Sequence, residues 1–124
     1  MKVEVLSLKG RDCVVNTKFG ILKVKTNDKF EINKSYYVDV DFKDIIDCNK
    51  QMFSDDKKES VIADGESYII NAELLTVGDG ILTVMIDKGF ASIDATNLDI
   101  LENAKHKFIK FKVSKIYINI EELN

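Results

Sequence analysis

Apolar and polar residues alternate along much of the chain, most regularly between Lys34 and Ile46. Val38, Val40 and Phe42 fall on alternate positions there, and the residues between them are polar. A period of two places one set of side chains on a buried face and the other on a solvated face, which is typical of a β-strand. We therefore predict a strand over 34–46 that packs one face against a core.

A second segment, Lys105 to Tyr117, repeats this pattern with Ile109, Phe111 and Val113 at the apolar positions. In both segments the alternation changes phase at a polar pair before apolar residues resume. These pairs are Lys43-Asp44 and Ser114-Lys115. An extra residue in a strand, a β-bulge, produces such a change, so we predict a bulge at the same point of each strand.

Glycines separate shorter segments of the same kind, and glycine suits tight turns because it accepts positive φ. We predict strands over 3–8, 13–16, 21–26, 81–86 and 90–95, and a hairpin around Asp64-Gly65. The segment 97–103 reads as a loop or one helical turn, and 105–120 as a pair of strands or one long bent strand.

The order of strands and turns in the first half recurs in the second half at an offset of 71 residues, or 70 for the early turns. This recurrence indicates an internal duplication. The alternative is that any two runs of short hairpins resemble each other. Each half has about 60 residues and buries too little surface to be secure alone, so the two halves should share a core.

We therefore predict an all-β protein of roughly nine or ten strands. The preferred arrangement is two small OB-like or SH3-like half-barrels packed into one compact unit, and the alternative is a single β-sandwich. The predicted division is 1–50 for the first β half, 51–66 for a connector with a hairpin, and 67–124 for the second β half.

The chain of 124 residues has no apolar run that could span a membrane, and its first residues lack the apolar region of a signal peptide. We therefore expect a cytoplasmic protein with no membrane association. Cys13 and Cys48 lie in or beside apolar runs without C-x-x-C spacing. In a reducing compartment they would remain thiols, and we interpret them as small buried side chains.

Sequence motifs for catalysis are missing: the chain has no phosphate-binding loop, dinucleotide fingerprint, G-x-S-x-G or H-E-x-x-H. His106 is the single histidine, which excludes a Ser-His-Asp triad or a multi-histidine metal site within one chain. Four aspartates, Asp39, Asp41, Asp44 and Asp47, could offer oxygens to a hard cation, but a solvated strand face explains them better. We predict that the protein is not an enzyme and uses no cofactor or metal.

The charge is unevenly distributed around a net value of −3. Residues 105–117 carry five lysines and no acid, and such a basic stretch beside an aromatic residue is used by OB-folds that hold single-stranded nucleic acid. The candidate residues are Lys107, Phe108, Lys110, Lys112 and Lys115. Because the protein is acidic and this stretch has no arginine, nucleic-acid binding is the alternative function.

Residues 67–104 carry six acids against one lysine. Most of these acids fall at predicted turns and strand ends, where they could form a negative surface for a basic protein partner. The candidate residues are Asp79, Asp87, Asp94, Asp99 and Glu102. The alternative is that they serve only solubility.

The two echoed strands also reverse charge at positions aligned by the offset of 71. The aligned pairs are Asp39 with Lys110, Asp41 with Lys112, and Asp44 with Lys115. If the halves pack about a pseudo-two-fold axis, or if two molecules meet head to tail, the acidic face of one strand could lie against the basic face of the other. The alternative is two independent exposed faces.

The segment Ile32 to Asp41, with Gly80-Ile81-Leu82 later, resembles small bacterial all-β proteins that carry a "G-K-x-Y-x-V-E-hydrophobic-D" strand. Asn33 stands where that pattern has glycine. Some of these proteins are similar to immunity proteins that neutralise secreted toxins. The resemblance implies a non-enzymatic cytoplasmic inhibitor, so we expect a β-barrel binding module for a protein partner, such as a basic toxin domain.

Overall fold

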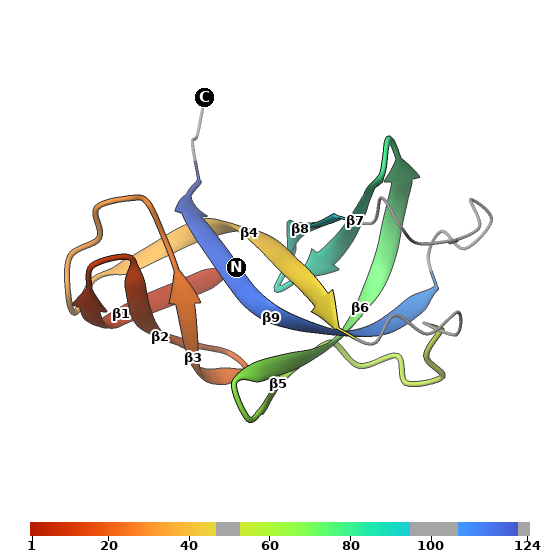
Figure 1. Ribbon diagram of the computed structural model, residues 1–124, viewed down its shortest axis with the longest axis horizontal. Helices are drawn as coiled ribbons and strands as arrows, with labels where there is room; N and C mark the ends of the chain where they lie inside the picture. The colour runs from red at the N-terminus through yellow and green to blue at the C-terminus, as the bar shows by residue number, and fades with distance from the viewer. Residues whose placement is uncertain (47–52, 95–106, 122–124) are drawn as a thin grey trace.

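The computed structural model describes residues 1–46, 53–94 and 107–121. Within these ranges the chain forms nine β-strands and no helix, which confirms the all-β prediction (Figure 1). The strands are β1 (Lys2–Lys9), β2 (Asp12–Thr17), β3 (Gly20–Lys25), β4 (Ser35–Ile46), β5 (Ser60–Asp64), β6 (Ser67–Gly78), β7 (Ile81–Ile86), β8 (Gly89–Asp94) and β9 (Phe108–Ile120). None of the described segments forms a helix long and apolar enough to cross a membrane.

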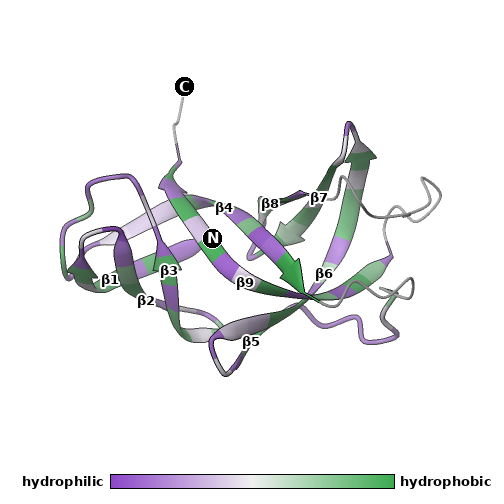
Figure 2. Ribbon diagram, in the orientation of Figure 1, coloured by the Kyte–Doolittle hydropathy of each residue, from purple (hydrophilic) through white to green (hydrophobic). Residues whose placement is uncertain are grey.

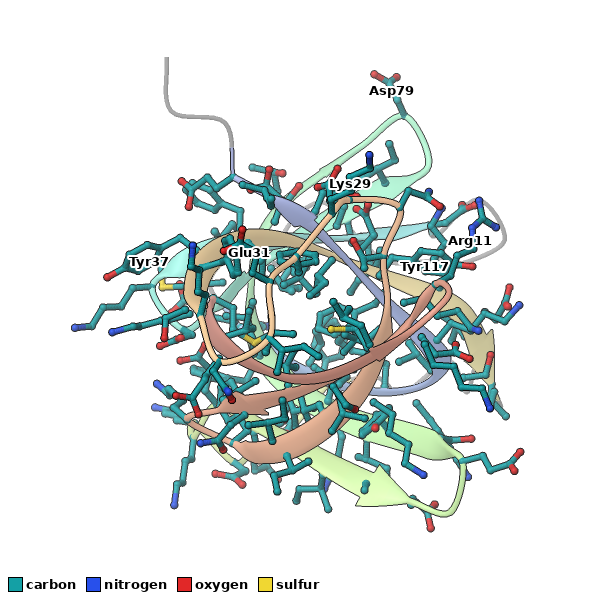
Figure 3. The ribbon with its side chains drawn as sticks, turned by 90° about the vertical axis from the view of Figure 1, so that its left-hand side faces the viewer. Arg11, Lys29, Glu31, Tyr37, Asp79 and Tyr117 are labelled. Atoms are coloured by element: carbon teal, nitrogen blue, oxygen red, sulfur yellow. The ribbon has the colours of Figure 1, made fainter. Side chains whose placement is uncertain are left out.

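All nine strands belong to one sheet in the order β1-β2-β3-β9-β4-β8-β7-β6-β5, with additional pairings of β1 with β4 and of β9 with β6. Following these pairings gives two closed circuits. The first circuit is β1-β2-β3-β9-β4, and the second circuit is β4-β8-β7-β6-β9. The long strands β4 and β9 pair antiparallel and belong to both circuits. Figure 3 looks into the first circuit, where the strands surround packed side chains.

The first three strands of the first circuit and β6 to β8 of the second circuit have the same register at an offset of 69. Leu8 pairs with Cys13 as Val77 pairs with Leu82. The β1–β2 register shifts between Val5 and Ser7, and the β6–β7 register shifts at the equivalent place, between Leu74 and Thr76. The β2–β3 and β7–β8 hairpins also match over their whole length.

The strands that follow these hairpins, β4 in the first half and β9 in the second, are related by a different offset. Glu4 pairs with Ser35, whereas Glu73 pairs with Phe108, which is 73 residues beyond Ser35. The connection before the fourth strand is therefore four residues longer in the second half. The predicted offsets, 71 and 70 for the early turns, lie between the two observed values and match neither register.

The predicted change of phase in β4 and β9 is confirmed. Buried side chains alternate up to Phe42 in β4, and Ile45 then packs against the core; in β9, Val113 and Ile116 are buried on either side of the change. The two strands nevertheless keep one register, with Phe42 opposite Ile116 and Ile45 opposite Val113. No bulge arises between them because both change phase at the same level. The change of phase in β4 occurs at Asp44, whose φ is 58°.

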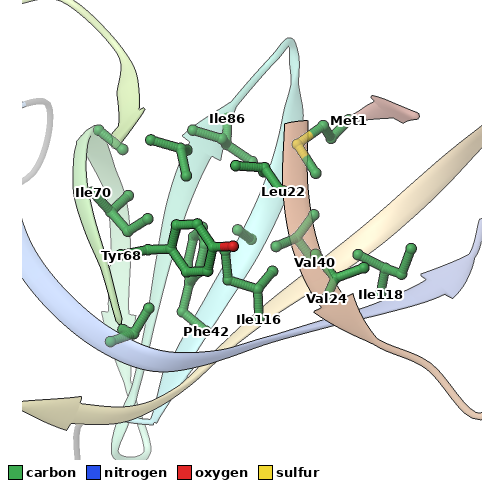
Figure 4. Close-up of a cluster of buried hydrophobic side chains, with 14 of the residues drawn as sticks. Met1, Leu22, Val24, Val40, Phe42, Tyr68, Ile70, Ile86, Ile116 and Ile118 are labelled. Atoms are coloured by element: carbon green, nitrogen blue, oxygen red, sulfur yellow. The ribbon is translucent and has the colours of Figure 1, made fainter. Parts of the chain in front are cut away.

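The core is one cluster of buried side chains that includes residues of both circuits. Figure 4 shows that Leu22 of β3, Ile86 of β7, Phe42 of β4 and Ile116 of β9 all belong to this cluster. Along β4 and β9 the apolar and polar positions alternate in Figure 2 as well. Cys13 is buried at 1% exposure, as expected from its apolar neighbours, and Cys48 lies outside the described residues.

Candidate functional site

An acidic cleft of about 430 Å³ opens on the outside of the second circuit. It is lined by Asp41, Phe42, Lys43, Asp44, Asp79, Gly80, Ile81, Ser92, Ile93 and Asp94. The lining therefore includes four aspartates and one lysine. Buried Phe42 and Ile93 form its floor, and Ile81, which is 48% exposed, gives the rim an apolar patch.

The turn between β6 and β7 carries Asp79 to the rim of the acidic cleft. Asp79 and Gly80 both have positive φ, 52° and 74°, as the two central residues of a type I′ turn require. Aspartate tolerates this conformation better than most residues do. The first register pair of β7 with β8 joins Ile81 to Asp94, so the turn brings both aspartates to the same end of the hairpin. Figure 3 shows Asp79 projecting from the top of the molecule.

The carboxylates Asp41 and Asp44 come from β4, which lies beside β8. Asp41 pairs in register with Ser92 of β8 and with Tyr117 of β9. Asp44 lies 3.4 Å from the ammonium group of Lys115 across the β4–β9 pair. Since both side chains are substantially exposed, this ion pair contributes at most about 1 kcal/mol to stability.

A basic cleft of about 720 Å³ opens beside the first circuit, between β3, the β5–β6 hairpin and the part of β9 around Lys115. Its charged lining residues are Lys9, Lys23, Lys25, Lys115, Asp12 and Glu66. The Lys25 ammonium donates a 2.8 Å hydrogen bond to Asp12. This bond lowers the pKa of Asp12 and raises the pKa of Lys25 relative to their ordinary values. Lys115 lines the basic cleft, whereas its partner Asp44 lines the acidic cleft. The ion pair of Asp44 with Lys115 therefore lies between the two clefts.

Asp87, another acid predicted for protein binding, lies at the opposite end of the β7–β8 hairpin from Asp79 and Asp94. Its carboxylate accepts a 3.0 Å hydrogen bond from the backbone N–H of Lys2 and lies 3.8 Å from the ammonium of Lys18. Asp87 therefore ties this turn to β1 and does not contribute to the acidic cleft. The remaining two candidates, Asp99 and Glu102, lie outside the described residues.

The lysines predicted to bind nucleic acid lie along β9 or, for Lys107, directly before it, and they differ in their surroundings. Lys107 lies over the ring of Phe53, 5.5 Å from its centroid. Lys112 lies 3.0 Å from the carboxylate of Asp64, and Lys115 is paired with Asp44. Phe108 is half-buried opposite Glu73, and Lys110 is exposed opposite Asn71. Acidic neighbours thus interrupt this stretch, and Lys115 lines a different surface from Lys107.

The proposed charge complementarity of β4 and β9 holds at one of its three positions. Asp44 and Lys115 form an ion pair. In the observed register, however, Asp39 lies opposite Asn119 and Asp41 opposite Tyr117. Within one molecule the hypothesis is wrong for these two aspartates. Antiparallel strands pair residues whose numbers have a constant sum, whereas the repeat aligned residues by a constant difference.

The sequence identified Asp79 and Asp94 as binding candidates, but it did not associate them with Asp41 and Asp44. The missing information was the parallel pairing of β4 with β8, which joins the two halves and leaves no periodic signal. The basic cleft was missed for the same reason, since its walls come from β3, the β5–β6 hairpin and β9. Among the described residues, no group of three or more His, Cys, Asp or Glu side chains could hold a metal ion.

No protein-family model, no curated protein and no solved structure matches the chain.

Proposed function

We propose that the protein is a non-catalytic binding module that holds a basic segment of a partner protein in the acidic cleft. The resemblance of its 32–41 segment suggests the biological form of this activity, a cytoplasmic inhibitor of the toxin-immunity type, with a basic toxin domain as partner. Single-stranded nucleic acid is less favoured because acids interrupt the lysines of β9 and pair with two of them.

The observation that carries the proposal is the convergence of Asp41, Asp79 and Asp94 on one hollow from β4, the β6–β7 turn and the end of β8. Lys43 is the one lysine among the lining residues. A concave negative surface attracts a basic partner and fixes its orientation. Exposed Ile81 on the rim adds the apolar contact on which a protein interface depends for much of its energy.

Affinity capture from cells that express the protein tests this proposal. The immobilised wild type is compared with the double variant Asp41→Asn and Asp79→Asn. Asparagine tolerates positive φ at position 79 at least as well as aspartate, so the β6–β7 turn should be retained. We expect a basic protein to be captured by the wild type. The double variant should bind it with a Kd raised roughly 5- to 30-fold, because each lost charge pair contributes about 0.5–1 kcal/mol.

The matched control is the double variant Asp39→Asn and Asp55→Asn, which changes the net charge equally. Both control residues are exposed, and neither lines the acidic cleft. The control should capture the partner as the wild type does. Equal losses in both double variants would mean that only net charge matters, and capture that is unchanged in the cleft variant would contradict the proposal.

We also propose that the two circuits are half-barrels that arose by internal duplication. The matching hairpin registers and the equivalent register shifts in β1 and β6 support this idea. Because β4 and β9 belong to both circuits, neither half has a complete ring of its own. Residues 1–50 and 67–124, expressed separately, should therefore fail to fold. Two fragments with dispersed amide spectra and cooperative melting would contradict the proposal that the half-barrels fold only when they are joined.

A further inference from the structure

The two circuits differ at one pair of strands. In the second circuit β8 lies beside β4, and the equivalent pair in the first circuit is β3 beside β9. In the second circuit, Ala91, Ser92 and Ile93 of β8 pair with β4. At the offset of 69, their equivalents in β3 are residues 22–24. In the described residues, β3 has one register pair with β9, between Lys25 and Tyr117. In the described part of the chain, the first circuit is therefore closed here by a single register pair, and most of this edge of β3 is open, with no strand paired to it.

The basic cleft lies along this open edge. The backbone N–H of Lys23 donates a 2.8 Å hydrogen bond to the hydroxyl of Tyr68, which comes from β6. Successive residues of an antiparallel strand direct their backbone groups to opposite sides. Lys23 directs its N–H away from β2, and Ile21, two residues earlier in the strand, directs its N–H to the same side. The Tyr68 hydroxyl thus occupies the place of a carbonyl from a neighbouring strand, while no strand pairs with Ile21 on this side in the described part of the chain.

Charge and shape indicate what could complete the edge. The lining of the basic cleft carries four lysines against two acids, and Ile21 adds an apolar side chain that is 65% exposed. A second copy of β3 would bring Lys23 and Lys25 of both molecules together, which disfavours self-pairing. The aromatic side chain in the lining is Tyr68, and at 7% exposure its ring offers no platform for stacked bases.

We propose that the open edge of β3 binds an extended acidic peptide segment of a partner protein by strand addition. The peptide backbone pairs with Ile21 and extends the sheet, and its acidic side chains lie near Lys9 and Lys23. Strand addition supplies affinity through backbone hydrogen bonds and specificity through alternate side chains. This site is separate from the acidic cleft. Its proposed ligand is acidic, whereas the proposed ligand of the acidic cleft is basic.

The test uses a fluorescent peptide of alternating glutamate and valine, about ten residues long. A second peptide has the same sequence with N-methyl groups on alternate backbone nitrogens, which block hydrogen bonding to a neighbouring strand. Binding is followed by fluorescence anisotropy, and hydrogen exchange is measured at the amide of residue 21. We expect the unmodified peptide to bind, to protect this amide, and to bind at least about tenfold more tightly than the N-methylated peptide.

Protein variants provide the second arm. Ile21→Pro removes the N–H at the edge, where proline is tolerated in strands, and should weaken binding about tenfold. Ile21→Thr keeps the N–H and should bind normally. Should Ile21→Pro fail to fold, the two peptides still decide the question on the wild-type protein. Equal binding of both peptides, no binding at about 1 mM peptide, or displacement of the peptide by oligothymidine from the amide of residue 21 would overturn the proposal.

Discussion

Replacement of Phe42 by alanine should destabilise both circuits together. The Phe42 side chain is 2% exposed, and its ring meets the ring of Phe111 edge to face at a centroid distance of 5.5 Å. It belongs to β4, where it pairs in register with Ile93 of β8 and Ile116 of β9. A cavity at this point therefore removes packing from the strands that the two circuits share.

The expected magnitude follows from the cost of deleting a buried aromatic side chain, about 3–5 kcal/mol. The free energy of unfolding in urea falls by about 1–3 kcal/mol per molar for small proteins. A loss of about 4 kcal/mol therefore lowers the urea midpoint by roughly 1.3–4 M. Phe42→Leu, which keeps most of the volume, should cost less than about 1.5 kcal/mol and provides a milder variant if the alanine protein is too unstable to study.

Methyl signals in NMR spectra recorded through a urea titration provide the assay. Val15 of β2 reports on the first circuit and Ile86 of β7 reports on the second, and both side chains are fully buried. Both signals should shift to the same lower midpoint in each Phe42 variant, because the shared strands couple the circuits. If Val15 kept its wild-type midpoint while that of Ile86 fell, the two circuits would unfold independently, which would refute coupling through the shared strands.

Three further predictions concern single sites. Lys88 has φ 65°, a backbone conformation that is strained for any residue with a side chain but not for glycine. Lys88→Gly should therefore raise the free energy of unfolding by about 0.5–1 kcal/mol in urea titrations, whereas Lys88→Ala should not. Equal effects of the two substitutions would show that Lys88 is not strained. The buried amide of Asn71 donates to the carbonyls of Asp56 at 2.9 Å and Lys58 at 2.8 Å. Asn71→Ala should therefore lose about 1–3 kcal/mol and speed amide exchange in 54–59; unchanged exchange would show that these bonds do not hold the segment. Burial raises the pKa of the Cys13 thiol, so at about pH 8.5 iodoacetamide should alkylate Cys13 far more slowly in the folded protein than in urea; equal rates by mass spectrometry would contradict this burial.

Most of the strands could be predicted from the sequence because they have one buried face and one exposed face. Positions Val38 and Val40 are buried as the alternation in 34–46 predicted, and 81–86 is a strand with the expected bounds. The hairpin near Gly65 also forms as predicted, with Gly65 at φ 62°. These features depend on local geometry and side-chain period, which a sequence carries directly.

Contacts between the halves could not be predicted in the same way. The pairings of β3 with β9 and of β4 with β8 join residues that are distant in the sequence. Side-chain alternation shows which face of a strand is buried but not which strand lies beside it. For this reason the sequence identified Asp79 as a binding candidate but did not predict that it would share a cleft with Asp41.

The most direct test of the acidic cleft is a map of amide shifts during titration with a basic peptide of alternating lysine and leucine. We predict that the largest shifts in the ¹⁵N-labelled protein will occur at residues 41–44, 79–81 and 92–94, which line the acidic cleft, and that Asp41→Asn with Asp79→Asn will reduce them. The control with Asp39→Asn and Asp55→Asn should behave as the wild type. Shifts spread evenly over the exposed acids, or centred on Asp55 and Asp56, would contradict a binding site in the acidic cleft.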